Sequence, residues 1–396
     1  MLTKGPLAGI RVLDFGRFIA GPYCGMLLAD MGADVIRIDR RHGSEDRFIG
    51  PVTEEGEGGS FLSLNRNKRS LTLDSSKAES GDVIRRLTAR ADVVVVNLPV
   101  GVMKKMGLDY DSLRAVKPDI ILARISAFGP DGPYANRLGF DAVVQAMSGA
   151  MALTGFGGHP VRSMAAFEDF GTALHTAFGV MVALYHRSQT GQGQIVDGSL
   201  LATGATFMQA FLAEHHVLGI KREQRGNSGF YSAPADAYRT QDGWIVIFAI
   251  GDDMFERWAR LVGHPEFIGD PRFVSDLLRA DNRDAITQAM NEWLATRTTA
   301  AALKELEAAR IPAGPVLDVD QVLDDPQVKA RELFRYVDYP GTPKAVPLAD
   351  TAVRLSATPG GIQRRAPTVG EHTKEILLEI GYSTEEISTL QRAEVV

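Results

Sequence analysis

Residues 10–39, IRVLDFGRFIAGPYCGMLLADMGADVIRID, decide the fold class of this chain. Two short runs typical of strands, Ile10–Phe15 and Asp34–Asp39, flank a stretch of helical length and composition, Pro22–Met31. The order strand, helix, strand predicts a βαβ unit, in which the two strands run parallel.

The same alternation continues through the first third of the chain. Three further runs are typical of strands and one further stretch is typical of a helix: Ser70–Asp74, Asp92–Asn97, Asp119–Ile125 and the helical Ala78–Arg90. Val93–Val96 is apolar on both faces of its pleat, which suits a parallel strand covered by helices on both sides. The alternation therefore predicts an α/β fold with a doubly wound sheet.

The strongest helical pattern in the chain lies over residues 172–187. One face of this helix carries apolar residues at the spacing i, i+3, i+4, i+7: Leu174, Ala177, Phe178, Met181, Leu184 and Tyr185. Thr190–Gln194 ends the helix, and a strand is expected to start at Ile195. A second long helix is expected over Leu200–Leu218.

The composition changes after this helix, which indicates a second domain. Gly219–Ala233 is rich in Gly, Ser, Lys, Arg and Asn and is interpreted as an exposed connection. A short hairpin around Gln241–Gly243, three helices near 252–263, 282–296 and 299–310, and a turn at Ile311–Pro315 are expected beyond it. We expect a large domain formed by 1–226, a small α+β domain over 227–325, and a C-terminal segment, 326–396, that returns to the large domain.

Composition excludes several classes of protein. The 396 residues hold 43 Lys and Arg against 49 Asp and Glu, a net charge of −6, so a nucleic-acid partner is not expected. A single cysteine, Cys24, excludes an internal disulfide and a cysteine-built zinc site. The longest nearly apolar run, Ala177–Tyr185, is about half of the 18–20 residues that a membrane span needs. We therefore expect a cytoplasmic protein with no membrane partner.

The turn after the first strand lies where a dinucleotide-binding fold has its glycine-rich turn, but its sequence differs. The turn reads Gly16-Arg17-Phe18-Ile19-Ala20-Gly21-Pro22, which lacks the G-x-G-x-x-G fingerprint. Arg40 follows Asp39 directly and offers a forked donor where an adenosine phosphate would lie. A generic α/β unit with a surface arginine remains the alternative interpretation.

Asp169 has two interpretations. It precedes the helical pattern, so it is a candidate N-cap that accepts the helix's unpaired N–H groups. The same position also suits a nucleophile, because the helix dipole holds a carboxylate ionised there and Gly171 lets another backbone approach closely. Such a carboxylate forms a covalent intermediate with an acyl group. Spacing alone does not choose between the two.

Three other groups of residues are considered as functional sites, and the sequence gives each of them less support than Asp169. His215-His216 sit at i, i+1 on a helix, so their rings diverge and do not form a metal pair. Asp252-Asp253 are interpreted as a helix cap. Arg66–Arg69 has the alternatives of a solvated turn and a phosphate-binding segment. No G-x-S-x-G, Walker A, H-E-x-x-H or EF-hand motif is present, and no metal site is expected.

Nine stretches, in order along nearly the whole chain, resemble the class III CoA-transferases, the group of formyl-CoA transferase and carnitine CoA-transferase. They are Leu7–Pro22, Gly32–Arg40, Asn65–Asp74, Asp92–Gly107, Ile125–Ser148, Asp169–Gly193, Gly226–Gly243, Ile311–Val316 and Gly370–Gly381. The resemblance implies an interlocked homodimer, in which each chain has a Rossmann-like large domain and a small domain.

The resemblance also implies the site. The family's nucleophilic aspartate falls on Asp169, and no tightly bound cofactor is implied, because coenzyme A is part of the substrate. The positions that contact CoA in the family fall on Ile19, Ala20, Arg40, Leu73, Ser75, Ser76, Asn97, Leu98, Lys105 and Arg137.

The sequence departs from the family pattern at three places, which affects the expected CoA contacts and substrates. Lys105 stands where an arginine is common, which keeps the charge but loses the bidentate fork. Ser76 replaces a lysine seen in some members, with Lys77 next to it. The glycine-rich flap of formyl-CoA transferases has no counterpart near 226–243, which weakens the expectation of oxalate or formate as a substrate.

The sequence therefore predicts an enzyme that moves CoA from an acyl-CoA donor to a carboxylic acid acceptor through a covalent intermediate at Asp169. Backbone N–H groups are expected to stabilise the oxyanions. Arg17, Arg47 and Arg162 are candidates for a second substrate carboxylate, so a dicarboxylate such as succinate is a plausible donor acid.

Two alternatives remain. The related 2-methylacyl-CoA racemases carry a histidine after the glycine in the motif matching Gly139-Phe140-Asp141, and phenylalanine cannot exchange a proton. The other alternative is a non-catalytic acyl-CoA-binding protein, which has no need of a nucleophile.

Overall fold

The computed structural model describes residues 5–396, which form two compact units. The first contains residues up to 150 together with 163–220 and 328–396, and the second contains 151–162 and 221–327. Residues 151–162 thus group with the second unit, although they lie inside the expected range 1–226. The domain limits expected from the sequence stay predictions.

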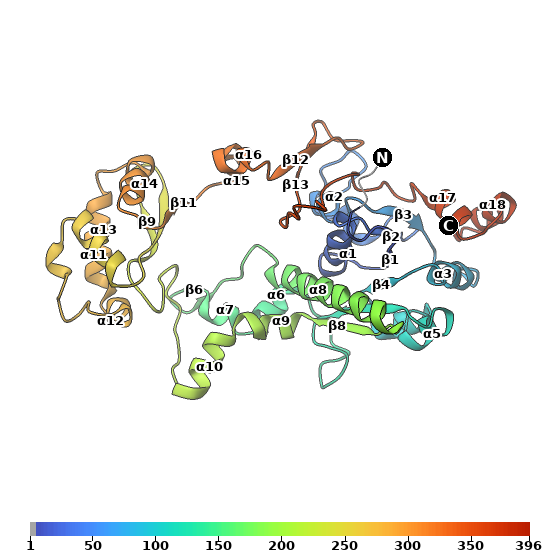
Figure 1. The fold of residues 1–396 in the computed structure, drawn as a ribbon, viewed down its shortest axis with the longest axis horizontal. Coiled ribbons are helices and arrows are strands. Elements are labelled where there is room, and N and C mark those ends of the chain that lie inside the picture. The colour runs from blue at the N-terminus through green and yellow to red at the C-terminus, as the bar shows by residue number, and fades with distance from the viewer. Residues whose placement is uncertain (1–4) are drawn as a thin grey trace. The chain divides into compact units, whose positions relative to one another are not determined.

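The first unit is built on a six-stranded sheet in which every pair of neighbouring strands is parallel. Its order is β3-β2-β1-β4-β5-β8 (Figure 1). The strands are β1 (Arg11–Asp14), β2 (Asp34–Asp39), β3 (Arg69–Thr72), β4 (Val93–Val96), β5 (Ile121–Ser126) and β8 (Ile195–Ser199). The order reverses between β1 and β4, which is where open α/β sheets bind ligands. The prediction of an α/β fold with a parallel sheet is confirmed.

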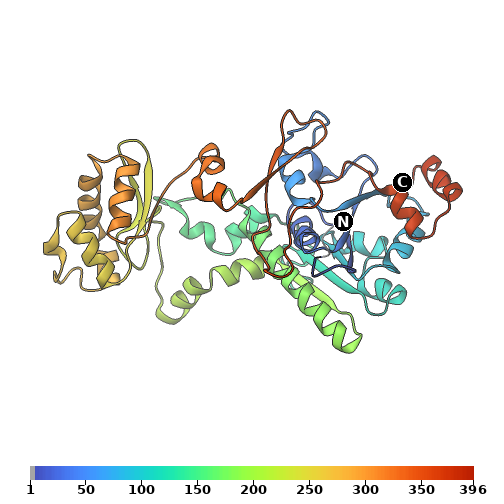
Figure 2. The ribbon, with the colours of Figure 1, turned by 45° about the horizontal axis from the view of Figure 1, so that its top comes forward.

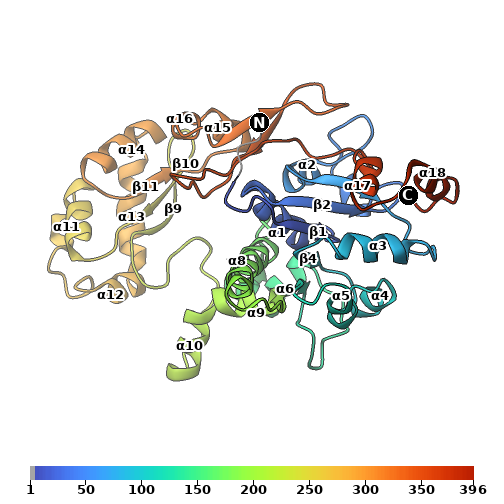
Figure 3. The same cartoon turned by 45° about the vertical axis from the view of Figure 1, so that its right-hand side comes forward.

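Helices cover both faces of this sheet, as the sequence of β4 predicts. The helices of the first unit are α1 (Ala20–Asp30), α2 (Gly59–Leu64), α3 (Ser80–Thr88), α4 (Val100–Lys105), α5 (Tyr110–Val116), α6 (Asp141–Met147), α8 (Phe167–Thr190), α9 (Leu200–Phe207), α10 (Gln209–Leu218), α17 (Thr373–Glu379) and α18 (Thr384–Arg392). Leu13, Ile36 and Val94 pack with α3, α5, α17 and α18 in one core cluster. Val12 and Val93 face the other way and pack with residues of α1 and α8. Figure 3 shows α1 and α8 next to each other beside β1.

The C-terminal residues belong to the same unit as the sheet. In Figure 2, α17 and α18 (red) lie beside the edge of the sheet formed by β2 and β3 (blue). Ile376 and Leu377 of α17 are fully buried in the core cluster that holds Val83 of α3. A hairpin of β12 (Phe334–Val337) and β13 (Val346–Ala349) and a 3₁₀ turn (Glu45–Phe48) complete the described elements of this unit.

The second unit has its own core beneath a three-stranded antiparallel sheet. The sheet order is β11-β10-β9, from Ala313–Pro315, Trp244–Phe248 and Ala235–Arg239. Trp258, Ile245 and Met290 are fully buried in this core. The other elements of this part of the chain are α7 (Ala150–Leu153), β6 (Gly155–Phe156), β7 (His159–Pro160), α11 (Asp252–Leu261), a 3₁₀ turn (Pro265–Phe267), α12 (Asp276–Asp281), α13 (Arg283–Leu294), α14 (Thr299–Ala308), α15 (Val319–Asp324) and α16 (Pro326–Ala330).

Several expectations about individual elements are wrong. The helix expected over Leu200–Leu218 is interrupted at Met208, and the turn expected at Ile311–Pro315 contains strand β11. Asp252 and Asp253 are the first two residues of α11 and do not cap it, because the N-cap is Gly251. No helix within residues 5–396 combines the length and the apolar character needed to cross a membrane.

The basic segment Arg66–Arg69 is neither a solvated turn nor a phosphate site. Three of its side chains are buried in ion pairs: Arg66 with Asp30, Lys68 with Asp14, and Arg69 with Asp34, each at 2.7 Å. The segment therefore contributes to the core of the first unit.

Candidate active site

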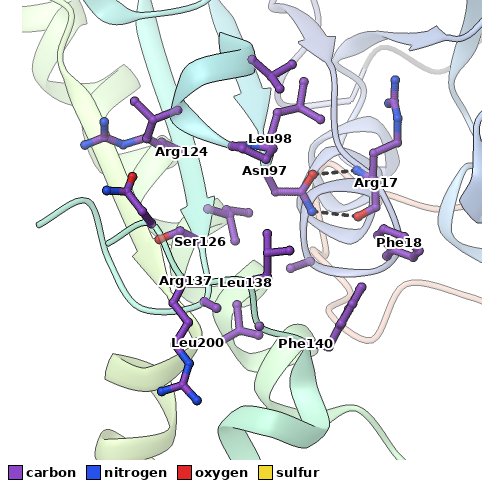
Figure 4. A pocket seen from close by; sticks show the side chains of 18 of the residues that line it. Arg17, Phe18, Asn97, Leu98, Arg124, Ser126, Arg137, Leu138, Phe140 and Leu200 are labelled. Carbon is purple, nitrogen blue, oxygen red and sulfur yellow. Dashed lines mark hydrogen bonds between the residues drawn. The ribbon is translucent and has the colours of Figure 1, made fainter. Parts of the chain in front are cut away.

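A cavity of about 530 Å³ opens at the carboxyl ends of the strands, next to the point where the strand order reverses. Its lining comes from the turn after β1, the residues after β4, the end of β5, the loop before α6, and the first turn of α8. Figure 4 shows Phe18 and Phe140 on one side of it, where their rings meet edge to face with centroids 5.2 Å apart.

The turn between β1 and α1 folds back tightly and forms one edge of the cavity. A Cβ atom on Gly16 would lie 2.8 Å from the backbone of Gly21, and one on Gly21 would lie 2.7 Å from the Cα of Gly16. Only glycine permits so close an approach. Phe18, between them, has a φ of 62°, a conformation that larger residues rarely adopt.

Asn97 ties this turn to the end of β4. Its Oδ1 accepts a hydrogen bond from the backbone N–H of Arg17 and its Nδ2 donates to the carbonyl oxygen of Arg17, each at 2.8 Å (Figure 4). Because both polar atoms of the amide are used, the side chain of Asn97 links the turn after β1 to the end of β4.

Arg17 is buried at the edge of the cavity without a carboxylate hydrogen-bonded to it among the described residues. Its Nη1 donates to the carbonyl oxygens of Phe15, at 3.1 Å, and Gly16, at 2.8 Å. Burial and then repulsion by Arg37 lower the pKa of Arg17, and nearby aspartates oppose this. Arg47, in contrast, is buried against Asp39 at 2.7 Å and does not line the cavity.

Asp169 lies in the first turn of α8 and lines the cavity. The N-cap of α8 is Ala166, which has no polar side chain, so the interpretation of Asp169 as an N-cap is wrong. The cap comes from α6, because Oδ2 of Asp141 accepts hydrogen bonds from the backbone N–H groups of Glu168 (2.9 Å) and Asp169 (3.2 Å).

The charge state of Asp169 also differs from the expectation. Burial, followed by the negative charges of Asp141 and Glu168, raises the pKa of Asp169 to about 7. The helix dipole was expected to hold this carboxyl ionised, but the carboxylate that satisfies the helix terminus is that of Asp141. The pKa of Asp169 therefore lies near neutral pH, so its ionised form is more basic than an ordinary aspartate.

Glu168 is a second buried carboxyl that sequence reasoning missed. Its Oε1 accepts from the Ser148 hydroxyl at 3.1 Å, while its buried Oε2 has no hydrogen-bond partner. Burial raises the pKa of Glu168 to about 7, and the bond from Ser148 opposes this. A Cβ on Gly204 would lie 2.6 Å from Oε1, so α9 packs on Glu168 only because residue 204 is glycine.

Comparison with known proteins places the chain in a family. Residues 7–373 match CoA-transferase family III. The chain belongs to this family. It is 34% identical over 395 residues, 99% of this chain and 98% of that protein, to succinyl-CoA–D-citramalate CoA-transferase of Chloroflexus aurantiacus. It is 36% identical over 392 residues, 96% of this chain and 98% of the other, to succinyl-CoA:mesaconate CoA-transferase of Haloarcula hispanica.

A solved structure is similar over almost the whole chain. A CAIB/BAIF family protein from Brucella suis matches with a TM-score of 0.85 and 34% identity, over 95% of this chain and all of that one. The protein is thus a class III CoA-transferase, an enzyme that transfers coenzyme A between carboxylic acids.

The cavity gathers about half of the positions expected for this enzyme. Six of them line it: Ala20, Arg40, Asn97, Leu98, Arg137 and Asp169. Five do not line it: Ile19, Leu73, Ser75, Ser76 and Lys105. Leu73 is buried in the core cluster of α3, whereas Ser75, Ser76 and Lys105 are exposed.

Other residues at or near the cavity were not identified as site residues from the sequence. Asp141 and Glu168 stand in motifs that the sequence marks for other reasons, Gly139-Phe140-Asp141 and Phe167–Gly171. Arg124 and Ser126 line the cavity because β5 ends there. Asp39 stands at the end of β2, where a dinucleotide-binding fold carries the acid that binds the ribose. Here each of its carboxylate oxygens forms an ion pair, one with Arg37 and the other with Arg47. Within residues 5–396 no group of His, Cys, Asp and Glu is arranged to hold a metal ion.

Proposed function

We propose that this cavity binds the thioester end of an acyl-CoA beside Asp169, and that CoA moves from donor to acceptor through a covalent aspartyl intermediate. The observation that carries the proposal is the position of Asp169: a carboxylate of raised pKa in the wall of the cavity, at the strand ends where the sheet order reverses. Raised basicity makes the ionised carboxylate a stronger nucleophile.

The proposed transfer has four steps. The Asp169 carboxylate attacks the thioester carbonyl of the donor, which forms an aspartyl–acyl anhydride and releases the CoA thiolate. The thiolate attacks the Asp169 carbonyl, which forms an aspartyl-CoA thioester and releases the donor acid. The acceptor carboxylate attacks this thioester, which forms an anhydride between Asp169 and the acceptor and releases the thiolate again. It then attacks the acceptor carbonyl, which yields the new acyl-CoA and restores Asp169. No net proton, metal or redox group is consumed.

The oxyanion of each tetrahedral intermediate needs donors other than the N–H groups next to the nucleophile. Those of Glu168 and Asp169 donate to Asp141, and that of Phe170 donates to the carbonyl oxygen of Ala166. We propose the backbone N–H of Ala20 instead. Ala20 is the first residue of α1 and lines the cavity, and the first N–H groups of a helix have no partner within it.

The cationic side chains around the cavity support binding of the CoA phosphates. Arg40 is largely exposed, with Glu45 at 3.3 Å, and Arg137 is exposed beside the rings of Phe128 and Tyr134. Arg137 offers a guanidinium fork to phosphate oxygens. Ile19, Leu73, Ser75, Ser76 and Lys105 stay proposed CoA contacts outside the described cavity.

For the substrates we propose succinyl-CoA as donor and a four- or five-carbon dicarboxylic acid as acceptor. The support is the names of the two relatives above, together with a buried guanidinium at the cavity. Of the three arginines considered for a second carboxylate, only Arg17 lines the cavity. A cytoplasmic location and the absence of a tightly bound cofactor stay predictions.

We further propose that the working enzyme is the interlocked homodimer that the family resemblance implies. The support comes from α8, where four residues of the expected apolar face are uncovered in the single chain while Ala177 and Leu184 are buried. Phe178 and Tyr185 are 72% and 71% exposed, and Leu174 and Met181 are exposed beside them. Several exposed large apolar side chains along one long helix are typical of an interaction surface.

The racemase alternative makes a distinct prediction. Position 140 is Phe140, whose ring packs against Phe18, so no second acid or base is present at that position to exchange an α-proton. Solvent deuterium that enters the α-position of a branched acyl-CoA, without transfer of CoA, would favour that alternative.

The experiment that tests the proposed function is intact-protein mass spectrometry after incubation with succinyl-CoA, followed by hydroxylamine and peptide mapping. We expect an adduct at Asp169 that hydroxylamine removes, and no adduct on an Asp169→Asn variant. Near-normal transfer by Asp169→Asn or Asp169→Ala would refute the nucleophile. CoA binding without any adduct or turnover would instead indicate a binding protein.

A further inference from the structure

We propose that Asp141 is a positioning residue that fixes the turn carrying the nucleophile and supplies a fixed negative charge beside it. The proposal deepens the proposed function, because it rests on Asp169 as the group that becomes acylated. It concerns a residue that does not contact the substrate in any proposed step.

The first support is the geometry of the helix terminus. Ala166, at the N-cap of α8, has only a methyl side chain. Asp141, the first residue of α6 and 28 positions before Asp169, reaches across and accepts from two successive N–H groups of α8. A side-chain cap normally comes from the helix's own N-cap residue. Here the orientation of Asp169 depends on a residue from another helix.

The second support is that Asp141 is itself held in place. Its Oδ1 accepts from Nε2 of Gln145, one turn further along α6, and the Oε1 of Gln145 accepts from the backbone N–H of Ser163 at 2.9 Å. Asp141 is 7% exposed. Both of its oxygens are used, so it acts through the backbone of Glu168 and Asp169 rather than on a substrate atom.

The third support is the charge that surrounds Asp169. No cation pairs with Asp141 within the described part of the chain. The groups that act on Asp169 are Asp141 from α6 and Glu168 from α8 itself. Of the helices packed against α8, α1 presents the ring of Tyr23 to Phe170, and α9 has no titratable side chain. Asp197 of β8 is paired with Arg124, and across the cavity lie Arg17, Arg40, Glu45 and Arg137.

This arrangement has a chemical consequence. An ionised Asp169 is repelled by the fixed charge of Asp141, whereas an acylated Asp169 is neutral and is not. Acylation therefore relieves the repulsion, and the charge passes to the thiolate of CoA. The same charge makes the resting carboxylate easier to protonate, so removing it is expected to extend activity to lower pH while making acylation slower.

Two substitutions separate the charge from the geometry. Asp141→Asn keeps the size and an oxygen acceptor but removes the charge, so the acid limb of kcat/KM is expected to move down by roughly one pH unit. Asp141→Glu keeps the charge but displaces the cap, so the acid limb is expected to stay in place while kcat falls, by about 10- to 100-fold. A residue that only stabilised the fold would not move the pH profile.

The matched control is Asp109→Asn. Asp109 caps α5 by accepting from the backbone N–H of Ser112 at 3.1 Å, far along the chain from the nucleophile. This variant removes the same charge from the same kind of helix terminus, and its pH profile is expected to match the wild type.

The outcomes distinguish this proposal from the proposed function. If the wild type forms no adduct at Asp169 with succinyl-CoA, the proposed function fails and this inference with it. If the adduct forms and Asp141→Asn leaves the acid limb unmoved, the charge role alone is overturned. If Asp141→Asn does not fold, Asp141→Glu decides, and an unchanged kcat in that variant overturns the positioning role.

Discussion

The ammonium of Lys68 lies 2.7 Å from Oδ2 of Asp14, and both side chains are fully buried. Asp14 ends β1, and its Oδ1 accepts from the backbone N–H of Gly16 at 2.8 Å. Lys68 also donates to the carbonyl oxygen of Pro22 at 2.7 Å. The ion pair therefore joins both ends of the turn that forms one edge of the cavity.

Removing one partner of this pair is expected to be costly. Lys68→Met would leave Asp14 buried without its nearest cation, and breaking a buried pair in this way costs about 3–5 kcal/mol. Chemical denaturation followed by circular dichroism measures the loss. The control is Arg85→Ala, which removes a largely exposed pair with Asp82 and is expected to cost less than about 1 kcal/mol. Equal losses in the two variants would contradict the importance of burial.

The activity is expected to have an acid limb set by Asp169. Its carboxyl must be ionised to attack, and its pKa is raised to about 7, chiefly by burial. We expect kcat/KM to fall about tenfold for each pH unit below that value, since it reports the ionisation of the free enzyme. Initial rates measured across pH 5–9 check this. A limb near pH 4, the ordinary value for a carboxyl, would contradict it.

The raised pKa also predicts that the nucleophile lowers stability. An aspartate whose folded pKa lies above its unfolded value binds more protons in the folded state, so stability falls as pH rises between the two values, from about 4 to about 7. Asp169→Asn is therefore expected to be more stable than the wild type at pH 8, by roughly 1–2 kcal/mol, and no more stable at pH 4. Denaturant titrations at the two pH values measure the difference.

The strands of the large unit were predictable because their signals are local. The expected runs Ile10–Phe15 and Asp34–Asp39 became β1 and β2 with limits shifted by one residue or none. Strand propensity and apolar residues on both faces of a pleat are properties of adjacent residues. They can therefore be recognised in the sequence. Asp169 was singled out in the same way from the contiguous stretch Phe167–Gly171, and it lines the cavity, whereas its role as the nucleophile stays a prediction.

The charges around the site were not predictable, because their partners are distant in the chain. Lys68 was expected in a solvated or phosphate-binding turn, but it is buried by Asp14, 54 positions earlier. The start of α8 was misplaced for the same reason, since its cap is Asp141. No local pattern distinguishes an aspartate that caps its own helix from one that caps another.

Gly204 is expected to be indispensable for the packing of α9 on α8. In Gly204→Ala, the new methyl group would lie 2.6 Å from both Oε1 of Glu168 and Cβ of Ser148. Overpacking of this kind costs about 1–3 kcal/mol, and it is expected to lower kcat because Glu168 adjoins the nucleophile. The control is Gly81→Ala in α3, where a Cβ meets nothing within 4 Å. That variant is expected to be neutral or slightly stabilised, because alanine favours helix.

The exposed stripe of α8 gives the last prediction. Phe178 is 72% exposed in the single chain and lies on the same face as Leu174 and Tyr185. If this stripe is the interface of the proposed homodimer, a charge in its centre must be desolvated without a partner, which strongly opposes association. Phe178→Glu is therefore expected to shift the protein from dimer to monomer in light scattering after gel filtration, with its circular dichroism spectrum unchanged. The matched substitution Arg85→Glu, on the exposed side of α3, is expected to leave the dimer intact. A wild-type protein that elutes as a monomer at micromolar concentration would refute the proposed interface.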